Sequence, residues 1–293
     1  SKIRVAISSN QYTADNSVDG AVQVYERPSS YGTWPQLGPI ITNIGSNEKL
    51  GHAVSLNHNG TIVACSSISG NGKVYIYTYS TLPWVSGQPT TYVWAQLGQT
   101  IEGDAGDIFG QSISLNYDST TIAIGAIGNR GTLNLNNCGT TRIYRYNKSL
   151  YQYDGTWVQL GSNIDGESEG DQSGWSVSLN DAGTTVAIGA KYANFGSTTQ
   201  SRGHIRTYKY GSGSWSRVAV DIDGNSNGSQ LGYSVSLDSS GTTVAGGDPT
   251  YDNGTKAPGQ VGVYTINNHS SYDYNIISVT SITDTNIHTL VNA

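Results

Sequence analysis

The sequence lacks most of the features that mark helical, membrane-spanning or disulfide-rich proteins. It contains no methionine, two cysteines, two phenylalanines and only 12% charged residues. No apolar run approaches the ~18 residues that a membrane span requires, so we expect no membrane insertion. Two cysteines are too few for a disulfide framework. A net charge of −6 without a basic stripe argues against a nucleic-acid partner.

Glycine and tyrosine are abundant instead, with 37 and 20 copies, which is typical of a β-rich chain with many turns. A repeat dominates the sequence. The motif Trp-x-Gln-Leu-Gly (94–98, 157–161) is followed each time by Gly-x-Ser-x-Ser-Leu-Asn and then by Ala-Ile-Gly-Ala. A glycine opening the second motif recurs about every 60 residues, which marks an array of one supersecondary unit. These glycines are Gly51, Gly110, Gly174 and Gly232.

Each unit predicts four antiparallel strands joined by short turns. Residues 176–179 alternate serine with valine or leucine, and residues 185–190 set valine and isoleucine against alanine and glycine. Because side chains alternate along a strand, each sheet has one bulky face and one small face. Bulky-on-small packing suits blades around an axis better than a flat sandwich.

The two ends of the chain complement each other in this pattern. Residues 4–9, 21–25 and 34–38 match the second, third and fourth strands of a unit whose first strand is missing. Residues 286–291 have the length and alternation of one strand, and we expect them to supply it. Closing a ring in this way removes exposed strand edges.

The sequence therefore predicts an all-β fold, a five-bladed β-propeller of four-stranded antiparallel blades closed by a C-terminal strand. We expect residues 1–293 to form one domain, and an open assembly of several chains is the structural alternative. The predicted blades are residues 1–40 with 284–293, 50–101, 109–164, 173–222 and 231–283.

Three motifs of the unit match a known blade type: Phe109-Gly110, residues 123–126 and residues 72–77. In these motifs the chain resembles FG-GAP repeats, the blades of integrin α-subunit heads and of many secreted microbial proteins. The resemblance extends over almost the whole chain and implies surface recognition and adhesion rather than catalysis. It does not carry over the family's calcium loops, because the matching turns hold too few carboxylates for six to eight oxygen ligands.

Acidic residues cluster in the loops that precede the first strands. One such loop carries Glu102, Asp104 and Asp107. Another carries the alternating set Asp165, Glu167, Glu169 and Asp171, which could wrap a Ca²⁺ ion. A solvated acidic loop is the favoured alternative, and we predict no other cofactor.

The residue after each repeated glycine varies although its surroundings do not, as expected of a binding rim on a constant frame. Packing of these side chains toward the axis is an equal alternative. The long, dissimilar connections between second and third strands share that face by chain direction, which makes it the expected recognition face. The candidate ligand-binding residues are His52, Gln111, Trp175 and Tyr233. Constant register assigns a packing role to four tryptophans: Trp34, Trp94, Trp157 and Trp215.

We predict no catalytic residues and no enzymatic activity. The five histidines show no metal-ligand spacing, and the sequence has no nucleophile elbow or phosphate loop. The alternative is a glycoside-hydrolase-like enzyme with carboxylates in the central funnel.

The predicted function is that of an extracellular or surface module that binds protein or carbohydrate and can self-assemble. We expect a secreted, mature chain, because it starts on a strand without a signal-peptide pattern. We expect Cys65 to be buried and Cys138 to face solvent. The sequence does not decide whether the two form a disulfide. Candidate glycosylation sites are Asn59, Asn147, Asn227, Asn253 and Asn268.

Overall fold

The fold is all-β in this computed structural model. The structure describes residues 3–11, 20–28, 32–42, 48–81, 91–148, 155–194, 201–250 and 259–266. These ranges form five antiparallel sheets of three to five strands and contain no helix. Accordingly, no helix in these ranges could cross a membrane.

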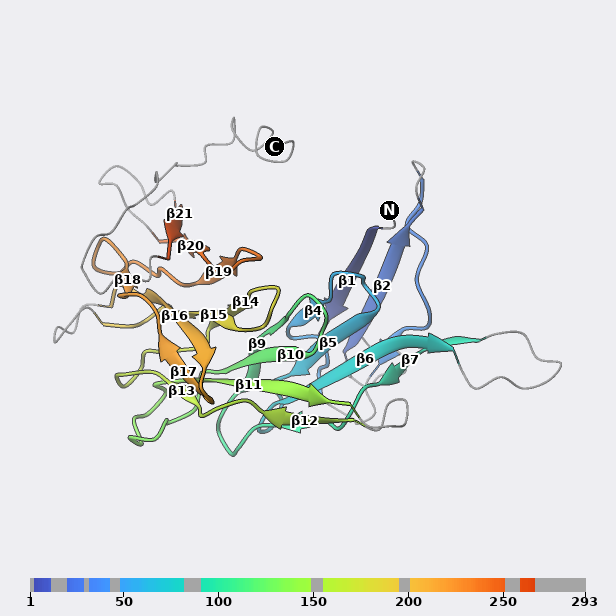
Figure 1. The fold of residues 1–293 in the computed structure, drawn as a ribbon, viewed down its shortest axis with the longest axis horizontal. Coiled ribbons are helices and arrows are strands. Elements are labelled where there is room, and N and C mark those ends of the chain that lie inside the picture. Colours follow the sequence, from blue (N-terminus) through green and yellow to red (C-terminus); the bar gives the residue numbers. More distant parts are fainter. Residues whose placement is uncertain are drawn as a thin grey trace.

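The five sheets follow one another along the chain and lie side by side in an arc (Figure 1). The first sheet contains β1 (Ile3–Ser9), β2 (Ala21–Arg27) and β3 (Ile41–Thr42). The second contains β4 (Val54–Leu56), β5 (Ile62–Ser67), β6 (Lys73–Thr81), β7 (Tyr92–Gln96) and β8 (Ile101–Glu102). The third contains β9 (Phe109–Leu115), β10 (Thr121–Ala126), β11 (Thr140–Asn147), β12 (Thr156–Gln159) and β13 (Ile164–Asp165). The fourth contains β14 (Ser176–Leu179), β15 (Thr185–Ala190), β16 (His204–Gly211), β17 (Ser214–Arg217) and β18 (Ile222–Asp223). The fifth contains β19 (Ser234–Leu237), β20 (Thr243–Asp248) and β21 (Gln260–Thr265).

A side-chain cap fixes the turn between the first and second strands of a unit. The Asn180 Oδ1 atom accepts hydrogen bonds from the backbone N–H groups of Thr184 at 2.9 Å and Thr185 at 2.8 Å. Asn57 and Asp238 accept the equivalent pairs in their own turns. These bonds explain why each first strand ends on asparagine or aspartate.

The sequence predicts a single outermost strand, the fourth, in each unit. In the second, third and fourth sheets two short strands take its place. In the second sheet β7 pairs with the later part of β6, while β8 pairs with its start at Lys73 and Val74. The Leu-Gly step separates the two pieces, since Gly98 has a φ of +75° and a Cβ there would lie 2.9 Å from the Trp157 ring. The glycine of the motif is thus a break in the strand.

Neighbouring sheets pack face to face through apolar side chains. Val74 and Ile76 of the second sheet meet Ile122 and Ile124 of the third, and all four are fully buried. Ala64 on β5 leaves room for this contact. The predicted bulky-on-small packing is confirmed for the second strand, although the third strand adds bulky residues to the small face.

The repeated tryptophans and serines join one sheet to the next by hydrogen bonds. The Trp157 indole donates to the Leu97 carbonyl of the preceding sheet at 2.9 Å, and Trp94 and Trp215 make the same bond. These bonds support the packing role predicted for Trp94, Trp157 and Trp215. Trp34 belongs to the first unit, which follows no earlier sheet in the described ranges; it is 40% exposed, so its predicted packing role is not supported. The inner-strand serines accept hydrogen bonds from leucine N–H groups of the next sheet: Ser55 from Leu115, Ser114 from Leu179 and Ser178 from Leu237.

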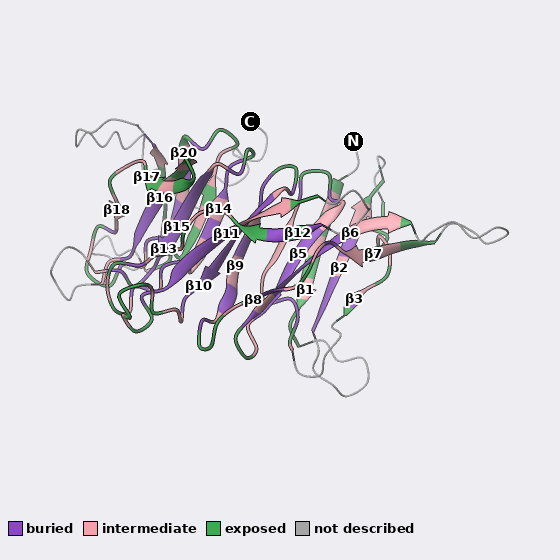
Figure 2. Ribbon diagram, turned by 60° about the horizontal axis from the view of Figure 1, so that its bottom comes forward, coloured by how far each residue is buried: buried purple, intermediate pink, exposed green. Residues whose placement is uncertain are grey.

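The two terminal sheets expose the faces that their neighbours bury. Val5 and Ile7 on β1 are 38% and 54% exposed, although the equivalent isoleucines of β10 are fully buried. Val261 and Val263 on β21, at the other end of the arc, are each 40% exposed. Figure 2 shows buried residues concentrated in the strands between these ends. Within the described ranges, β1 pairs only with β2. The strand expected at 286–291 and the diverged strand near 274–279 lie outside the described residues.

Both cysteines are buried and unbonded. Burial of Cys65 confirms the prediction. The expected exposure of Cys138 is wrong, because it is only 1% exposed. The loop 127–139 folds back on the chain, and the carbonyl of Cys138 accepts a hydrogen bond from Ser173 N–H at 2.9 Å.

Candidate functional site

One edge of the sheets gathers the variable parts of the chain. We call it the loop face: it holds the leading loops before β4, β9, β14 and β19, and the connections after β5, β10 and β15. Three parallel bridges join such connections to the next leading loop: Gly20 with Leu50, Gly139 with Ser173, and Gly203 with Leu231. Only glycine fits at Gly139, where φ is +76° and a side chain would collide with the Ser173 backbone. The shared face expected from chain direction is therefore present. The opposite edge, the turn face, carries the first-to-second-strand turns.

The four candidate rim residues lie on the loop face in two contacting pairs. His52 and Gln111 lie beside each other, and their side chains interact. Burial lowers the pKa of the imidazole by more than this interaction raises it, so the pKa lies below its ordinary value. Trp175 and Tyr233 place their ring centroids 5.8 Å apart, and Tyr233 is 45% exposed. The sequence pattern therefore located side chains that the fold brings together.

A lysine that the sequence analysis missed completes the aromatic pair. Lys191 follows β15 directly, and its Nζ atom lies 3.1 Å from the Trp175 ring centroid. The same atom lies 4.5 Å from the Tyr192 centroid and 5.4 Å from the Tyr233 centroid. A signal existed in the sequence, because the equivalent positions in the other units hold uncharged residues: Asn10, Ile68, Ile127 and Pro249.

Acidic residues of the leading loops form ion pairs with arginines on the third strand of their own sheet. Arg142 on β11 contacts Asp104 at 2.8 Å and Asp107 at 2.9 Å. Arg206 on β16 contacts Glu167 at 2.6 Å and Asp221 at 2.8 Å. Both guanidinium groups are largely buried, so these pairs lock the loops onto the sheets.

The four carboxylates proposed for Ca²⁺ do not converge. Asp165 accepts from the Thr140 hydroxyl and the Thr132 N–H, and Glu169 accepts from the Asn136 amide. Glu167 faces Arg206, as above. The remaining member, Asp171, caps the N–H of Ser168 and is 2% exposed, and burial raises its pKa. No three of these four carboxylates have oxygens within 4.8 Å of one another. Calcium binding there stays a prediction without support from this geometry.

A different triplet brings ligand-type atoms within 4.8 Å of one another: His204, Asp221 and Asp223. Burial lowers the pKa of His204 to about 3, so its ring is neutral. The Asp221 carboxylate already accepts two hydrogen bonds from Arg206, at 2.8 and 3.0 Å. The positive charge beside Asp221 is thus already supplied by Arg206, and the triplet lies at the start of β16 and in and just before β18 rather than on an inner strand. A resident metal does not fit this donor set.

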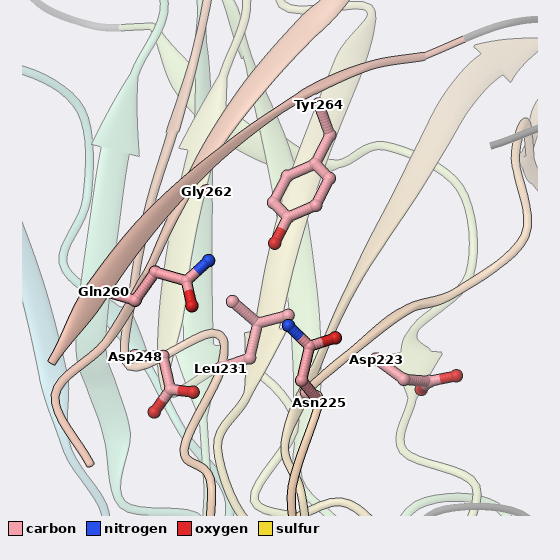
Figure 3. A pocket seen from close by; sticks show the side chains of 8 residues that line it. Asp223, Asn225, Leu231, Asp248, Gln260, Gly262 and Tyr264 are labelled. Atoms are coloured by element: carbon pink, nitrogen blue, oxygen red, sulfur yellow. The ribbon is translucent and has the colours of Figure 1, made fainter. Parts of the chain in front are cut away.

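A small open pocket lies between the leading loop of the fifth sheet and β21 (Figure 3). It is hollow because Gly262 occupies the register of Arg142 and Arg206. Tyr264 points its hydroxyl toward this space, and burial raises the pKa of that group. Asp248 accepts hydrogen bonds from Ser229, Gln230 and Thr250, which makes it a loop cap rather than a free acid.

Three of the five candidate glycosylation sites belong to the described part of the chain. Asn59, Asn147 and Asn227 are all exposed. Asn59 and Asn147 lie at the turn face, away from the rim residues, while Asn227 lies in a leading loop. Asn253 and Asn268 lie outside the described residues.

Comparison with known proteins gives only distant structural likenesses. No family model matches the chain, and no curated protein matches it. It is similar to the solved structure of a putative 6-phosphogluconolactonase from Bacteroides uniformis, with 10% identity and a TM-score of 0.43 over 94% of this chain and 84% of that chain. A putative TolB from Agrobacterium tumefaciens has 13% identity and a TM-score of 0.42 over 84% of this chain and 66% of that chain. These likenesses are too distant to carry an argument about function. The strand order itself defines the class, an all-β protein of propeller-like antiparallel sheets.

Proposed function

We propose that this protein is a non-catalytic recognition or structural module, secreted or displayed on a surface, that binds a protein or glycan through its loop face. One observation carries the proposal. The residue after the repeated glycine differs between units although the surrounding motif does not. These residues are His52, Gln111, Trp175 and Tyr233, and their side chains lie in pairs on the face that also holds the unique loops. Variable side chains on a rigid frame are the usual basis of recognition. The FG-GAP resemblance is consistent with this role.

The proposal includes a ring of five blades closed within one chain. The exposed valines of β21 and the exposed Val5 and Ile7 of β1 occupy equivalent positions to pairs that pack together elsewhere. Arrays of repeats need their end faces covered, and these two faces are complementary. A C-terminal strand beside β1 would complete the first blade. Head-to-tail assembly with further chains is the alternative cover.

The second candidate function is a glycoside-hydrolase-like enzyme. The described carboxylates argue against it. Asp104, Asp107 and Glu167 pair with arginines, Glu169 accepts from an amide, and Asp171 and Asp248 cap loops. The inner strands β4, β9, β14 and β19 contain no aspartate or glutamate. A glycosidase needs two carboxylates on opposite sides of one bond.

A glycan and protein binding screen with two matched variants tests the loop face. Tyr233→Ala removes a 45% exposed ring from the loop face, and Tyr117→Ala removes an equally exposed ring from the turn face. We expect Tyr233→Ala to weaken partner binding at least tenfold, about 1.4 kcal/mol, and Tyr117→Ala to leave it unchanged. The opposite ranking, or turnover of a glycoside by the wild-type protein, would refute the proposal.

A further inference from the structure

We propose that Lys191, Trp175, Tyr192 and Tyr233 form a binding site for a sugar unit that carries one carboxylate, such as a hexuronate. This inference rests on the proposed function, since it names the ligand class that the loop face takes. The site combines one cation with three aromatic rings on adjoining segments of the fourth and fifth sheets.

The first argument is the state of Lys191. The residue is only 7% exposed, and no carboxylate in the described ranges lies within 4.0 Å of its Nζ atom. Aromatic faces compensate only part of the cost of burying an ammonium group. A ligand carboxylate would supply the missing partner.

The second argument is the exposure of the rings. Tyr192 is 40% exposed and Tyr233 is 45% exposed, and Trp175 is half-buried beside both Lys191 and Tyr233. Such rings offer flat apolar surfaces with polar rims, which suits the C–H face of a sugar. Cages of aromatic rings also bind quaternary ammonium ligands. Here Lys191 already occupies the cation position, which favours an anion instead.

The third argument is the number of charges. Among the described residues Lys191 is the one cation over these rings, and the leading loop before β14 carries Glu169, which accepts a hydrogen bond from the neutral Asn136 amide. A ligand with many carboxylates, such as an acidic peptide, would be repelled by that loop. A single carboxylate on a sugar ring matches the single ammonium group. The geometry therefore favours a glycan over a peptide.

Titration calorimetry or ligand-observed NMR tests the site with two sugars that differ at one position. The probes are methyl β-D-glucuronide and methyl β-D-glucoside, with an acetylated tri-glutamate peptide as a third. The wild-type protein should bind the glucuronide about tenfold or more tightly than the glucoside. Lys191→Met should erase this preference without lowering the melting temperature, and Lys191→Arg should keep it. Tyr233→Ala should weaken both sugars, and Tyr117→Ala should weaken neither.

Several results would overturn the inference: equal binding of the two sugars, no binding of either, an unchanged preference in Lys191→Met, or tighter binding of the peptide. Equal binding that Tyr233→Ala abolishes would remove the acidic preference and leave the proposed function standing. Failure of the proposed function looks different, since partner capture would then be insensitive to Tyr233→Ala.

Discussion

The hydrogen bond from the motif tryptophan to the preceding sheet predicts that replacing this tryptophan lowers the free energy of unfolding. Trp157 is 3% exposed, packs 5.1 Å from the Tyr146 ring and donates to the Leu97 carbonyl. Replacing it by phenylalanine keeps one ring but leaves that carbonyl unpaired, at about 1–3 kcal/mol. Loss of the second ring from a packed interface adds a comparable term, so we expect about 3 kcal/mol in total.

Urea unfolding followed by far-UV circular dichroism measures this cost without relying on tryptophan fluorescence. Val158→Ala is the matched control, because Val158 is the next residue of β12 and is 47% exposed. We expect the control to change the free energy of unfolding by less than about 1 kcal/mol. If Trp157→Phe costs no more than Val158→Ala, the tryptophans do not join the sheets in the way described.

Four further predictions concern buried groups and the acidic loop. The pKa of His204 is about 3 in the folded protein against 6.5 ordinarily, so the unfolded chain binds more protons and stability should fall from pH 6.5 toward 3, by up to about 1.4 kcal/mol per pH unit. His204→Thr, which copies Thr140, should flatten this slope in pH-dependent melts. Arg206→Ala should cost about 3–5 kcal/mol in chemical denaturation and exposed Arg217→Ala less than about 1 kcal/mol; similar costs would refute the locking role of Arg206. Cys65 and Cys138 should react with a thiol reagent only after unfolding, and fast reaction of the native protein would contradict their burial. Calorimetry with Ca²⁺ should give no saturable heat, and a clear isotherm would restore the acidic loop as a metal site.

The repeated parts of the structure could be predicted because several copies carry the same local signal. The alternation at Val177 and Leu179, the cap at Asn180 and the register of Trp157 each recur, and in the central sheets each has a similar environment. A pattern that recurs in every sheet must satisfy the same contacts each time. It therefore defines strands, turns and packing without reference to distant residues.

The unique parts could not be predicted in the same way. Cys138 lies in a loop found in one unit only, and its burial depends on a bridge to the next leading loop. The pairing of Glu167 with Arg206 joins residues far apart in the sequence, and no periodicity connects them. Lys191 was recognisable as the odd residue at its position, but its aromatic partners come from three segments. Contacts of this kind depend on the tertiary arrangement.

Reactivity of a single introduced thiol tests ring closure most directly. Ile7→Cys places the thiol on β1, at a residue that is 54% exposed in the described arc of sheets. Leu133→Cys places it at a loop residue that is 74% exposed. The rates of maleimide labelling are compared in the full-length chain under conditions where light scattering shows a monomer. A closed ring predicts that Ile7→Cys reacts about 100-fold more slowly than Leu133→Cys, because the fifth sheet and the C-terminal strand cover it. Equal rates in the monomer would contradict closure and leave an open array.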